Sequence, residues 1–174
     1  MGAGLETIAE SIREAGGIDG VIGFSQGGAA AAFVASLLEP GREEAFAAYG
    51  SQNPAAMPYP SSFSRLKTSL GQQELKFAVS YSGFYAPSDL YRAFYAPKIS
   101  TKMLHVIGSL DSVVDESRSI GLVDACAGEP RVLRHPGGHF VPVSKDVTGV
   151  LVGFIRESCE PPQDESVEDT DVPF

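Results

Sequence analysis

One stretch near the N-terminus decides the fold: Ile18-Asp19-Gly20-Val21-Ile22-Gly23-Phe24-Ser25-Gln26-Gly27. Its first part is short and apolar, which is typical of a buried strand, and the alanine-rich residues 26–38 that follow predict a helix. Ser25 therefore stands in a G-x-S-x-G sequence between a strand and a helix, the pattern of a nucleophile elbow. Such a turn presents the serine hydroxyl at the carboxyl end of the strand, and the N–H of Gln26 points toward a developing oxyanion.

The alternative for this motif is a glycine-rich turn with no catalytic role, because a bare G-x-S-x-G also occurs by chance. The strand and the helix on either side favour the elbow. In an elbow, Gly23 and Gly27 are expected to let the strand and the helix approach each other without a side-chain clash.

Strand and helix patterns alternate along the rest of the chain. Strands are predicted over 75–81, 102–107 and 131–135, and helices over 3–15, 115–126 and 144–158. Residues 41–74 are rich in proline and are expected to be a loop-rich insertion with one short helix near 61–70. The alternation indicates a mostly parallel sheet with helices on both faces, so the predicted fold class is α/β, of the α/β-hydrolase type.

An acid and a base are needed to activate a serine hydroxyl, which is a weak nucleophile alone. In this fold the acid and the base follow the serine in that order, each just after a later strand. Asp111 follows the strand at 102–107, and His139 follows the strand at 131–135 after a pair of glycines. The sequence thus predicts a triad of Ser25, Asp111 and His139.

Other residues compete for the roles of acid and base. Asp115 lies four residues beyond Asp111, where a helix N-cap is the better explanation. His105 lies within an apolar strand and is interpreted as a core side chain, whereas His135 ends a strand and is a candidate for a supporting role. The three histidines lack the spacing of a metal site with a nearby carboxylate pair, so no metal is expected.

Aromatic residues gather after the second predicted strand: Tyr81, Phe84, Tyr85, Tyr91, Phe94 and Tyr95. Two interpretations stay open for them. They form a lid or part of the core, or they form the wall of an acyl pocket, since loops at this edge of the sheet surround the site. Phe84 and Tyr85 are the predicted substrate-binding residues.

The composition limits the partners and the compartment. The chain has 174 residues and a net charge of −9, which argues against a nucleic-acid partner. No apolar run is long enough to span a membrane, and the first residues lack the pattern of a signal peptide. Cys126 and Cys159 are too few for a disulfide framework, so reduced, buried thiols in a cytoplasmic protein are expected.

The C-terminal end differs in composition from the rest. Residues 1–158 are predicted to form one hydrolase domain, and 159–174 an acidic tail. From Glu160 onward the chain contains six acidic residues, three prolines, and no Lys or Arg. Such a segment buries too little apolar surface to offset its ordering entropy, so the tail is expected to be disordered.

Four segments resemble the fungal FSH-type serine hydrolases of the α/β-hydrolase superfamily: 19–27, 81–84, 105–111 and 135–142. The resemblance runs in the same order from about residue 5 to 156. It implies an α/β-hydrolase fold, a Ser25-Asp111-His139 triad, and esterase or thioesterase activity on acyl chains without a cofactor. Some members of this family release carrier-bound thioester products in fungal polyketide pathways. Nothing in the sequence resembles a pteridine or dinucleotide site.

One departure from the family pattern concerns the start of the chain. Family members have several strands and a His-Gly loop ahead of the elbow, whereas this chain begins at the helix leading into it. That loop supplies a second oxyanion N–H, and loss of such a donor costs about 10²–10³ in rate in other hydrolases. We expect N-terminal truncation, which exposes an apolar sheet edge at Val21, Ile22 and Phe24, or a sheet completed by another chain. The alternative function is a catalytically impaired remnant or a non-catalytic binding module.

Overall fold

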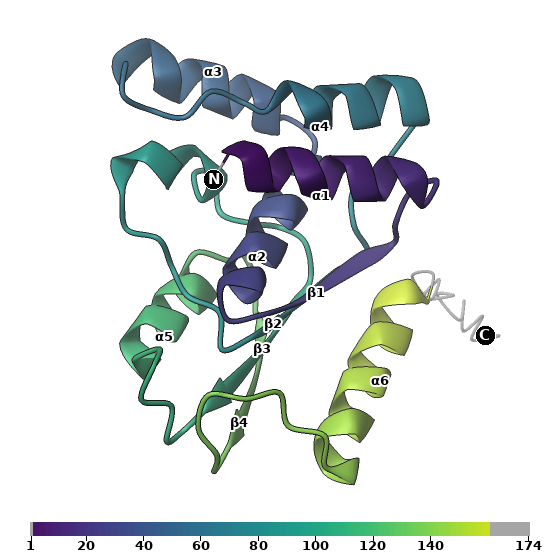
Figure 1. Ribbon diagram of the computed structural model, residues 1–174, viewed down its shortest axis with the longest axis vertical. Coiled ribbons are helices and arrows are strands. Elements are labelled where there is room, and N and C mark those ends of the chain that lie inside the picture. Colours follow the sequence, from purple (N-terminus) through teal and green to yellow (C-terminus); the bar gives the residue numbers. More distant parts are fainter. Residues whose placement is uncertain (1, 161–174) are drawn as a thin grey trace, which may run out of the picture.

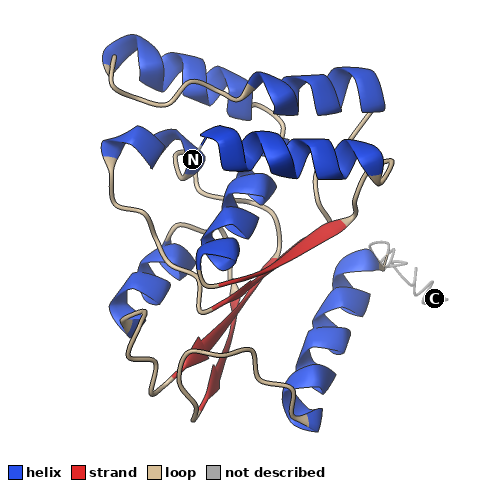
Figure 2. Cartoon of the chain, in the orientation of Figure 1, coloured by secondary structure: helices blue, strands red, loops and turns tan. Residues whose placement is uncertain are grey.

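A computed structural model describes residues 2–160 and contains a four-stranded parallel sheet (Figures 1 and 2). In spatial order, which is also chain order, the strands are β1 (Gly20–Phe24), β2 (Phe77–Tyr81), β3 (Met103–Gly108) and β4 (Arg131–His135). Because all three neighbouring pairs are parallel, the carboxyl ends of the strands meet at one edge of the sheet. The predicted α/β fold with a parallel sheet is confirmed.

Helices cover both faces of the sheet (Figure 1). The α-helices are α1 (Gly2–Glu14), α2 (Gln26–Leu38), α3 (Arg42–Gln52), α4 (Ser61–Arg65), α5 (Glu116–Asp124) and α6 (Lys145–Cys159). A π-helical turn at Leu66–Leu70 continues α4, and a 3-10 helix spans Asp89–Phe94. Helices α1, α2 and α5 lie on one side of the sheet and α6 on the other, while α3 and α4 form an outer layer over α1 and α2.

Two apolar layers hold the helices to the sheet. In the larger layer, the fully buried rings of Phe33 on α2 and Phe94 stack with centroids 4.1 Å apart. In the smaller layer, Phe154 on α6 packs edge-on against Phe77 of β2, with centroids 6.3 Å apart. Since α2 begins directly after Ser25 and is buried along most of its length, packing fixes the position of its N-terminus.

The segment 41–74 differs from its prediction, because α3 occupies residues expected to be a loop. Gly41 adopts a left-handed backbone (φ 72°) at the N-cap, which only glycine adopts at little cost, so a new helix starts directly after Pro40-Gly41. On its inner side α3 buries Arg42, whose guanidinium pairs with Glu39 and donates to the Pro97 carbonyl at 2.6 Å. A buried arginine in place of an aliphatic residue weakens the apolar period by which a helix is recognised.

Smaller corrections concern element ends. Strand β1 begins two residues later than predicted, because the N–H of Ile18 donates to the side chain of Gln72 (2.9 Å) instead of joining the sheet. Helix α5 ends before Cys126, which forms an isolated bridge with Ile99. Cys159 is the last residue of α6 and is exposed, so its predicted burial is wrong. The rest of the predicted tail, 161–174, lies outside the described residues.

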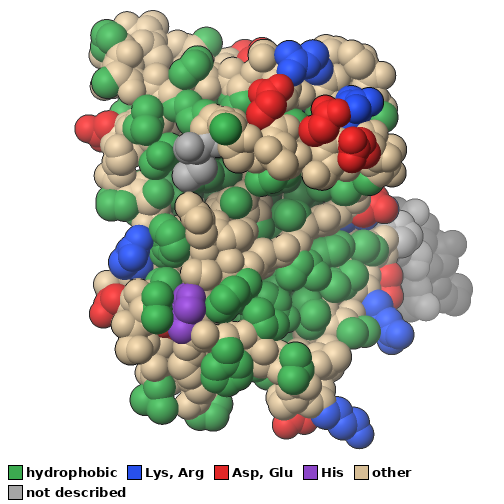
Figure 3. Space-filling model, viewed as in Figure 1, with side chains coloured by type: hydrophobic (Ala, Val, Ile, Leu, Met, Phe, Trp, Pro, Cys, Tyr) green, Lys and Arg blue, Asp and Glu red, His purple; other side chains and the backbone are tan. Residues whose placement is uncertain are grey.

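In the described part of the chain, β1 pairs with β2 alone and forms one border of the sheet. The side chains of Ile22 and Phe24 are 51% and 38% exposed, while Val21 points to the opposite face and packs against the core. Figure 3 shows apolar side chains gathered across the middle of this side of the molecule. The expected apolar edge is therefore present at Ile22 and Phe24.

Candidate active site

Ser25 lies on a strained turn between β1 and α2. Its backbone has φ 56° and ψ −119°, a conformation that residues with a side chain rarely adopt. The N–H of Ser25 donates to the carbonyl of Tyr81 at 2.8 Å, which fixes the turn to the end of β2. This is the geometry expected of a nucleophile elbow, and it holds the Ser25 hydroxyl at the carboxyl edge of the sheet.

Two glycines allow this turn, Gly23 and Gly28, and only Gly23 belongs to the G-x-S-x-G motif. A Cβ on Gly23 would lie 1.9 Å from the carbonyl oxygen of Gly27, and one on Gly28 would lie 2.9 Å from the Cα of Gly83. A Cβ on Gly27 would meet no atom within 4 Å. The expectation of close approach is therefore right for Gly23 and wrong for Gly27. The neighbouring Gly28 carries the second close contact, which the Gly27-Gly28 pair in the sequence could have suggested.

The predicted nucleophile, base and acid come together at this edge. His139 Nε2 lies 2.9 Å from Ser25 Oγ, and His139 Nδ1 lies 2.8 Å from Asp111 Oδ2. Since the carboxylate only accepts, the ring carries its proton on Nδ1, and Nε2 accepts the hydrogen bond that Ser25 donates. The side chains of His139 and Asp111 are 17% and 4% exposed, so the pair is largely shielded from water while Ser25 remains reachable.

Asp111 is held as an ionised carboxylate. Burial by itself would raise its pKa, but hydrogen bonds from the Val114 N–H, the His139 ring and the Val113 N–H outweigh burial and lower the pKa to about 2. Both backbone bonds reach Oδ1 at 2.9 Å, which leaves Oδ2 to accept from His139. A charged acid of fixed orientation stabilises the imidazolium that forms when His139 takes a proton.

The competing residues lie in other environments. Asp115 caps α5, where its side chain accepts from the N–H of Ser117 at 2.9 Å. His105 is buried in β3, and its Nε2 lies 3.6 Å from the Sγ of Cys126. Burial lowers the pKa of His105 to about 4 and raises that of Cys126 to about 12, so both groups are neutral near pH 7.

His135 supports the loop that carries His139. Its Nδ1 accepts from the N–H of Gly137 at 3.2 Å, and its ring packs edge-on against Phe140 at 5.2 Å. Its side chain is buried at the end of β4. These contacts fit the supporting role considered for it.

Gln26, the predicted oxyanion donor, is the first residue of α2. The N–H groups in the first turn of a helix have no acceptor within the helix, and the helix dipole adds positive potential at this end. The Gln26 N–H therefore follows the nucleophile directly and has no acceptor within α2.

An apolar cavity of about 470 Å³ opens next to Gln26 and Gly27. Its walls come from α1, α2, the loop after β2 and the 3-10 helix at Asp89–Phe94: Gly4, Leu5, Ile8, Gln26, Gly27, Ala29, Ala30, Phe33, Phe84, Ala86 and Tyr91. Of the two predicted substrate-binding residues, Phe84 lines the cavity. Tyr85 does not; its ring lies against Tyr95 with centroids 4.4 Å apart.

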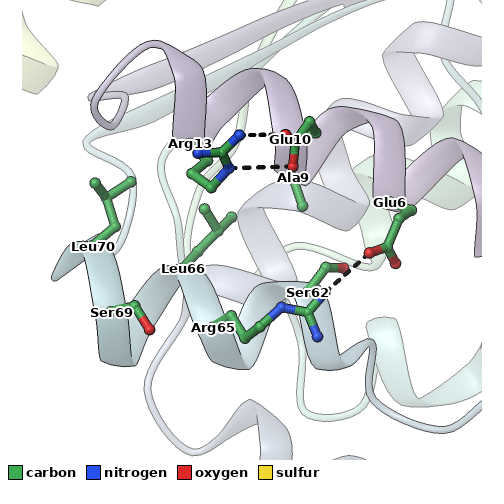
Figure 4. Close-up of a pocket in the computed structure, with 9 residues that line it drawn as sticks. All are labelled: Glu6, Ala9, Glu10, Arg13, Ser62, Arg65, Leu66, Ser69 and Leu70. Atoms are coloured by element: carbon green, nitrogen blue, oxygen red, sulfur yellow. Dashed lines mark hydrogen bonds and ion pairs between the residues drawn. The ribbon is translucent and has the colours of Figure 1, made fainter.

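A second cavity, of about 330 Å³, lies between α1 and α4 (Figure 4). Glu6 on α1 pairs with Arg65 on α4 at 3.0 Å, and Glu10 pairs with Arg13 along α1. All four side chains are more than half exposed. No residue of the candidate active site lines this cavity, and we assign it no part in the chemistry.

Two further findings apply to residues 2–160. No cluster of three or more His, Cys, Asp or Glu side chains in this part of the chain could hold a metal ion. None of its helices has both the length and the apolar character needed to cross a bilayer.

A parallel sheet with a serine elbow after one strand, and an acid and a histidine after two later strands, defines an α/β hydrolase. Solved structures share this fold: Zea mays acyl-protein thioesterase 2 aligns with 90% of this chain and 65% of its own, at 19% identity and a TM-score of 0.53. The sequence matches the family described as "Serine hydrolase (FSH1)" over residues 1–150. The chain belongs to this family of serine hydrolases.

Several curated relatives are longer than this chain. A Schizosaccharomyces pombe protein named dihydrofolate reductase is 36% identical over 138 residues, which are 79% of this chain and 25% of that protein. "Family of serine hydrolases 3" of Saccharomyces cerevisiae is 32% identical over 83% of this chain and 46% of its own. "Esterase OVCA2" of Danio rerio is 30% identical over 87% of this chain and 55% of its own. The chain thus spans between a quarter and just over half the length of these relatives.

Proposed function

We propose that this protein hydrolyses carboxylic esters and thioesters of acyl chains through an acyl-enzyme formed on Ser25. The observation that carries the proposal is the hydrogen-bonded chain from Ser25 through His139 to Asp111, with distances of 2.9 and 2.8 Å. Membership of a serine hydrolase family, and relatives named as esterases, support the same reaction class.

The proposed reaction has two halves. Ser25 Oγ attacks the carbonyl carbon while His139 Nε2 takes the hydroxyl proton, and Asp111 stabilises the resulting imidazolium. The carbonyl oxygen becomes an oxyanion that accepts from the Gln26 N–H. His139 returns the proton to the leaving alcohol or thiol as the acyl-enzyme forms. Water then attacks the acyl-enzyme with His139 as the base, which releases the carboxylic acid and restores Ser25.

A fluorophosphonate probe tests this proposal directly, because it phosphonylates an activated serine. The folded chain, with cooperative unfolding shown first, is expected to be labelled at Ser25, and labelling is expected to vanish in Ser25→Ala and His139→Ala. Ser109→Ala serves as a control, since it removes another serine hydroxyl near the same edge. A folded wild-type chain that takes up no label would overturn the proposal and favour a non-catalytic binding module.

The apolar cavity beside Gln26 is proposed to hold the acyl chain. A carbonyl oxygen bound at the Gln26 N–H directs one substituent of the carbonyl carbon toward Ala30 and Phe33, which line the cavity. A volume of about 470 Å³ lies within the range of small-molecule pockets. Each methylene group buried there is expected to raise kcat/KM about fourfold, until the cavity is full.

A chain-length series tests the cavity. Ala30→Leu places a larger side chain in it, so p-nitrophenyl esters of eight or more carbons should lose most of their advantage while the acetate ester is still hydrolysed at a similar rate. Ala45→Leu is the matched control, because Ala45 is also a half-buried helical alanine but lies on α3, outside the cavity. Equal effects of Ala30→Leu on short and long chains would place the acyl group elsewhere.

Thioesters are proposed as the preferred substrates, including carrier-bound thioesters of fungal secondary metabolism. A thiol has a pKa near 8.5, so it leaves as a thiolate with less help from the acid than an alcohol needs. Around the site, the loops that hold Asp111 and His139 expose Leu110, Val113 and Val143, which offers a carrier an apolar rim. Matched oxyesters and thioesters of one acyl chain test this preference; equal or faster hydrolysis of the oxyester would contradict it.

A further inference from the structure

A second strained residue lies beside the candidate triad. Among residues 2–160, positive φ angles outside glycine occur at Ser25 (56°) and at Ser82 (45°). The first is explained by the elbow. A serine held in the left-handed region costs free energy, and such residues collect at functional sites because the surrounding structure must hold them there. Ser82 has no role in the reaction described so far.

The backbone around Ser82 is tied to both neighbouring strands. Ser82 directly follows β2, the strand between β1, which leads to Ser25, and β3, which leads to Asp111. The N–H of Ser82 donates to the carbonyl of Val106 on β3 at 2.8 Å, and the carbonyl of the preceding Tyr81 accepts from the N–H of Ser25 at 2.8 Å. Ser82 is therefore fixed between the nucleophile and the acid.

The hydroxyl of Ser82 is buried and has no hydrogen-bond partner among the described residues. Ser82 is 2% exposed, and its Oγ completes no hydrogen bond in the conformation shown, a costly state for a buried hydroxyl. It is nevertheless close enough to Asp111 to be one of the groups that lower the pKa of that carboxyl. A carboxylate offers about four acceptor positions, and Asp111 uses three, two on Oδ1 and one on Oδ2. One position on Oδ2 is left for a further donor.

We propose that Ser82 is a positioning residue, whose hydroxyl donates to the Asp111 carboxylate and holds it in line with His139. The strained backbone is what aims this hydroxyl between β1 and β3 toward the acid. The inference rests on the proposed function, in which Asp111 orients His139. Without the Ser82 donor, the carboxylate is free to tilt away from His139 Nδ1, and a misplacement of this kind lowers the rate of the chemical step.

The test compares three variants with the wild-type protein. Ser82→Ala removes the hydroxyl, Ser82→Gly removes it and also relieves the positive φ, and Ser80→Ala removes another buried hydroxyl without a partner, two residues earlier on β2. A carbon-13 NMR titration of the Asp111 carboxyl needs no turnover, so its result stands even if the proposed hydrolysis fails. Loss of one donor to a carboxylate is expected to raise the pKa of Asp111 by about one unit in both Ser82 variants and to leave it unchanged in Ser80→Ala.

Kinetics give the second readout. In both Ser82 variants kcat should fall about tenfold with KM unchanged, because only the alignment of acid and base is lost. If Ser82→Ala does not fold, Ser82→Gly still tests the proposal, because glycine adopts the left-handed backbone freely. An Asp111 pKa in Ser82→Gly equal to that of the wild type would overturn the proposal and leave Ser82 with a structural role alone. A rise of the Asp111 pKa by the same amount in Ser80→Ala would also overturn the proposal.

Discussion

Gly23 lies where β1 turns into α2, and the backbone of Gly27 occupies the space that a side chain would need. We predict that Gly23→Ala destabilises the fold by about 3 kcal/mol or more, because the clash is with backbone atoms that no side-chain rotation can relieve. Gly27→Ala is the matched control. Its Cβ meets open space within a helix, so it should be neutral or stabilise the protein by about 0.5–1 kcal/mol.

Urea unfolding of the two glycine variants measures this difference. Equal losses in free energy of unfolding would mean that the G-x-S-x-G pattern acts as a unit. A loss confined to Gly23→Ala would show that close packing at one glycine is what the elbow requires.

The site illustrates what sequence alone can give at the residue scale. Ser25, Asp111 and His139 could be predicted because each follows a strand, and the order of the strands brings the ends together. The positions of Ser82 and Gly28 could not, since they depend on how tightly β2 and α2 approach each other. The contact of the Tyr85 ring with Tyr95 depends on packing in the same way.

At the scale of single elements, β3 buries His105 among apolar neighbours, where its side chain is 2% exposed. Burial lowers its folded-state pKa to about 4, below the ordinary value of 6.5. The unfolded chain therefore binds a proton on His105 at a higher pH than the folded protein does. This residue contributes stability that is fully present above pH 6.5 and is lost as the pH falls toward 4.

We predict that the free energy of unfolding falls by about 3 kcal/mol more between pH 7 and pH 4 in the wild-type protein than in His105→Met. Methionine fits beside Met103 and Cys126 and does not titrate. Denaturant unfolding at several pH values measures how the free energy of unfolding of each protein depends on pH. The other histidines are present in both proteins, so their effects cancel in the comparison. If the free energy of unfolding depends on pH in the same way in both proteins, His105 is not the group whose protonation destabilises the fold.

Among the elements, the strands were the easiest to predict and α3 the hardest. The strand β4 coincides with its prediction, because turn residues bound it on both sides, Pro130 before it and Pro136-Gly137 after it. The sequence does not predict α3, because Phe46 is the one apolar side chain that this helix buries fully, one turn after the buried Arg42. The charge of Arg42 is satisfied by Glu39 and by carbonyl groups distant in sequence, which no local pattern reveals.

At the scale of the whole molecule, the border strand β1 offers its backbone and the side chains of Ile22 and Phe24 to other strands. An exposed apolar border of this kind favours association between molecules. We predict that Ile22→Lys reduces concentration-dependent association of this chain, since charged residues on border strands oppose strand pairing. Val152→Lys adds the same charge to an exposed position on α6 and should have little effect.

Sedimentation velocity over a range of protein concentrations measures this association. If the two lysine variants behave alike, net charge rather than the border of the sheet controls association. If neither associates less than the wild type, the surface across β1 is not the contact.

The candidate site depends on the complete sheet. Ser25 and His139, whose side chains share a hydrogen bond, are 114 residues apart in the sequence, and three parallel pairings lie between their strands. In terms of folding kinetics, the reacting groups meet through contacts of high sequence separation, which form slowly because loop closure must precede them. Helices can form locally long before that point. Labelling of Ser25 by an active-site probe during refolding should therefore follow recovery of helical circular dichroism, and should report the docking of β4 onto β3.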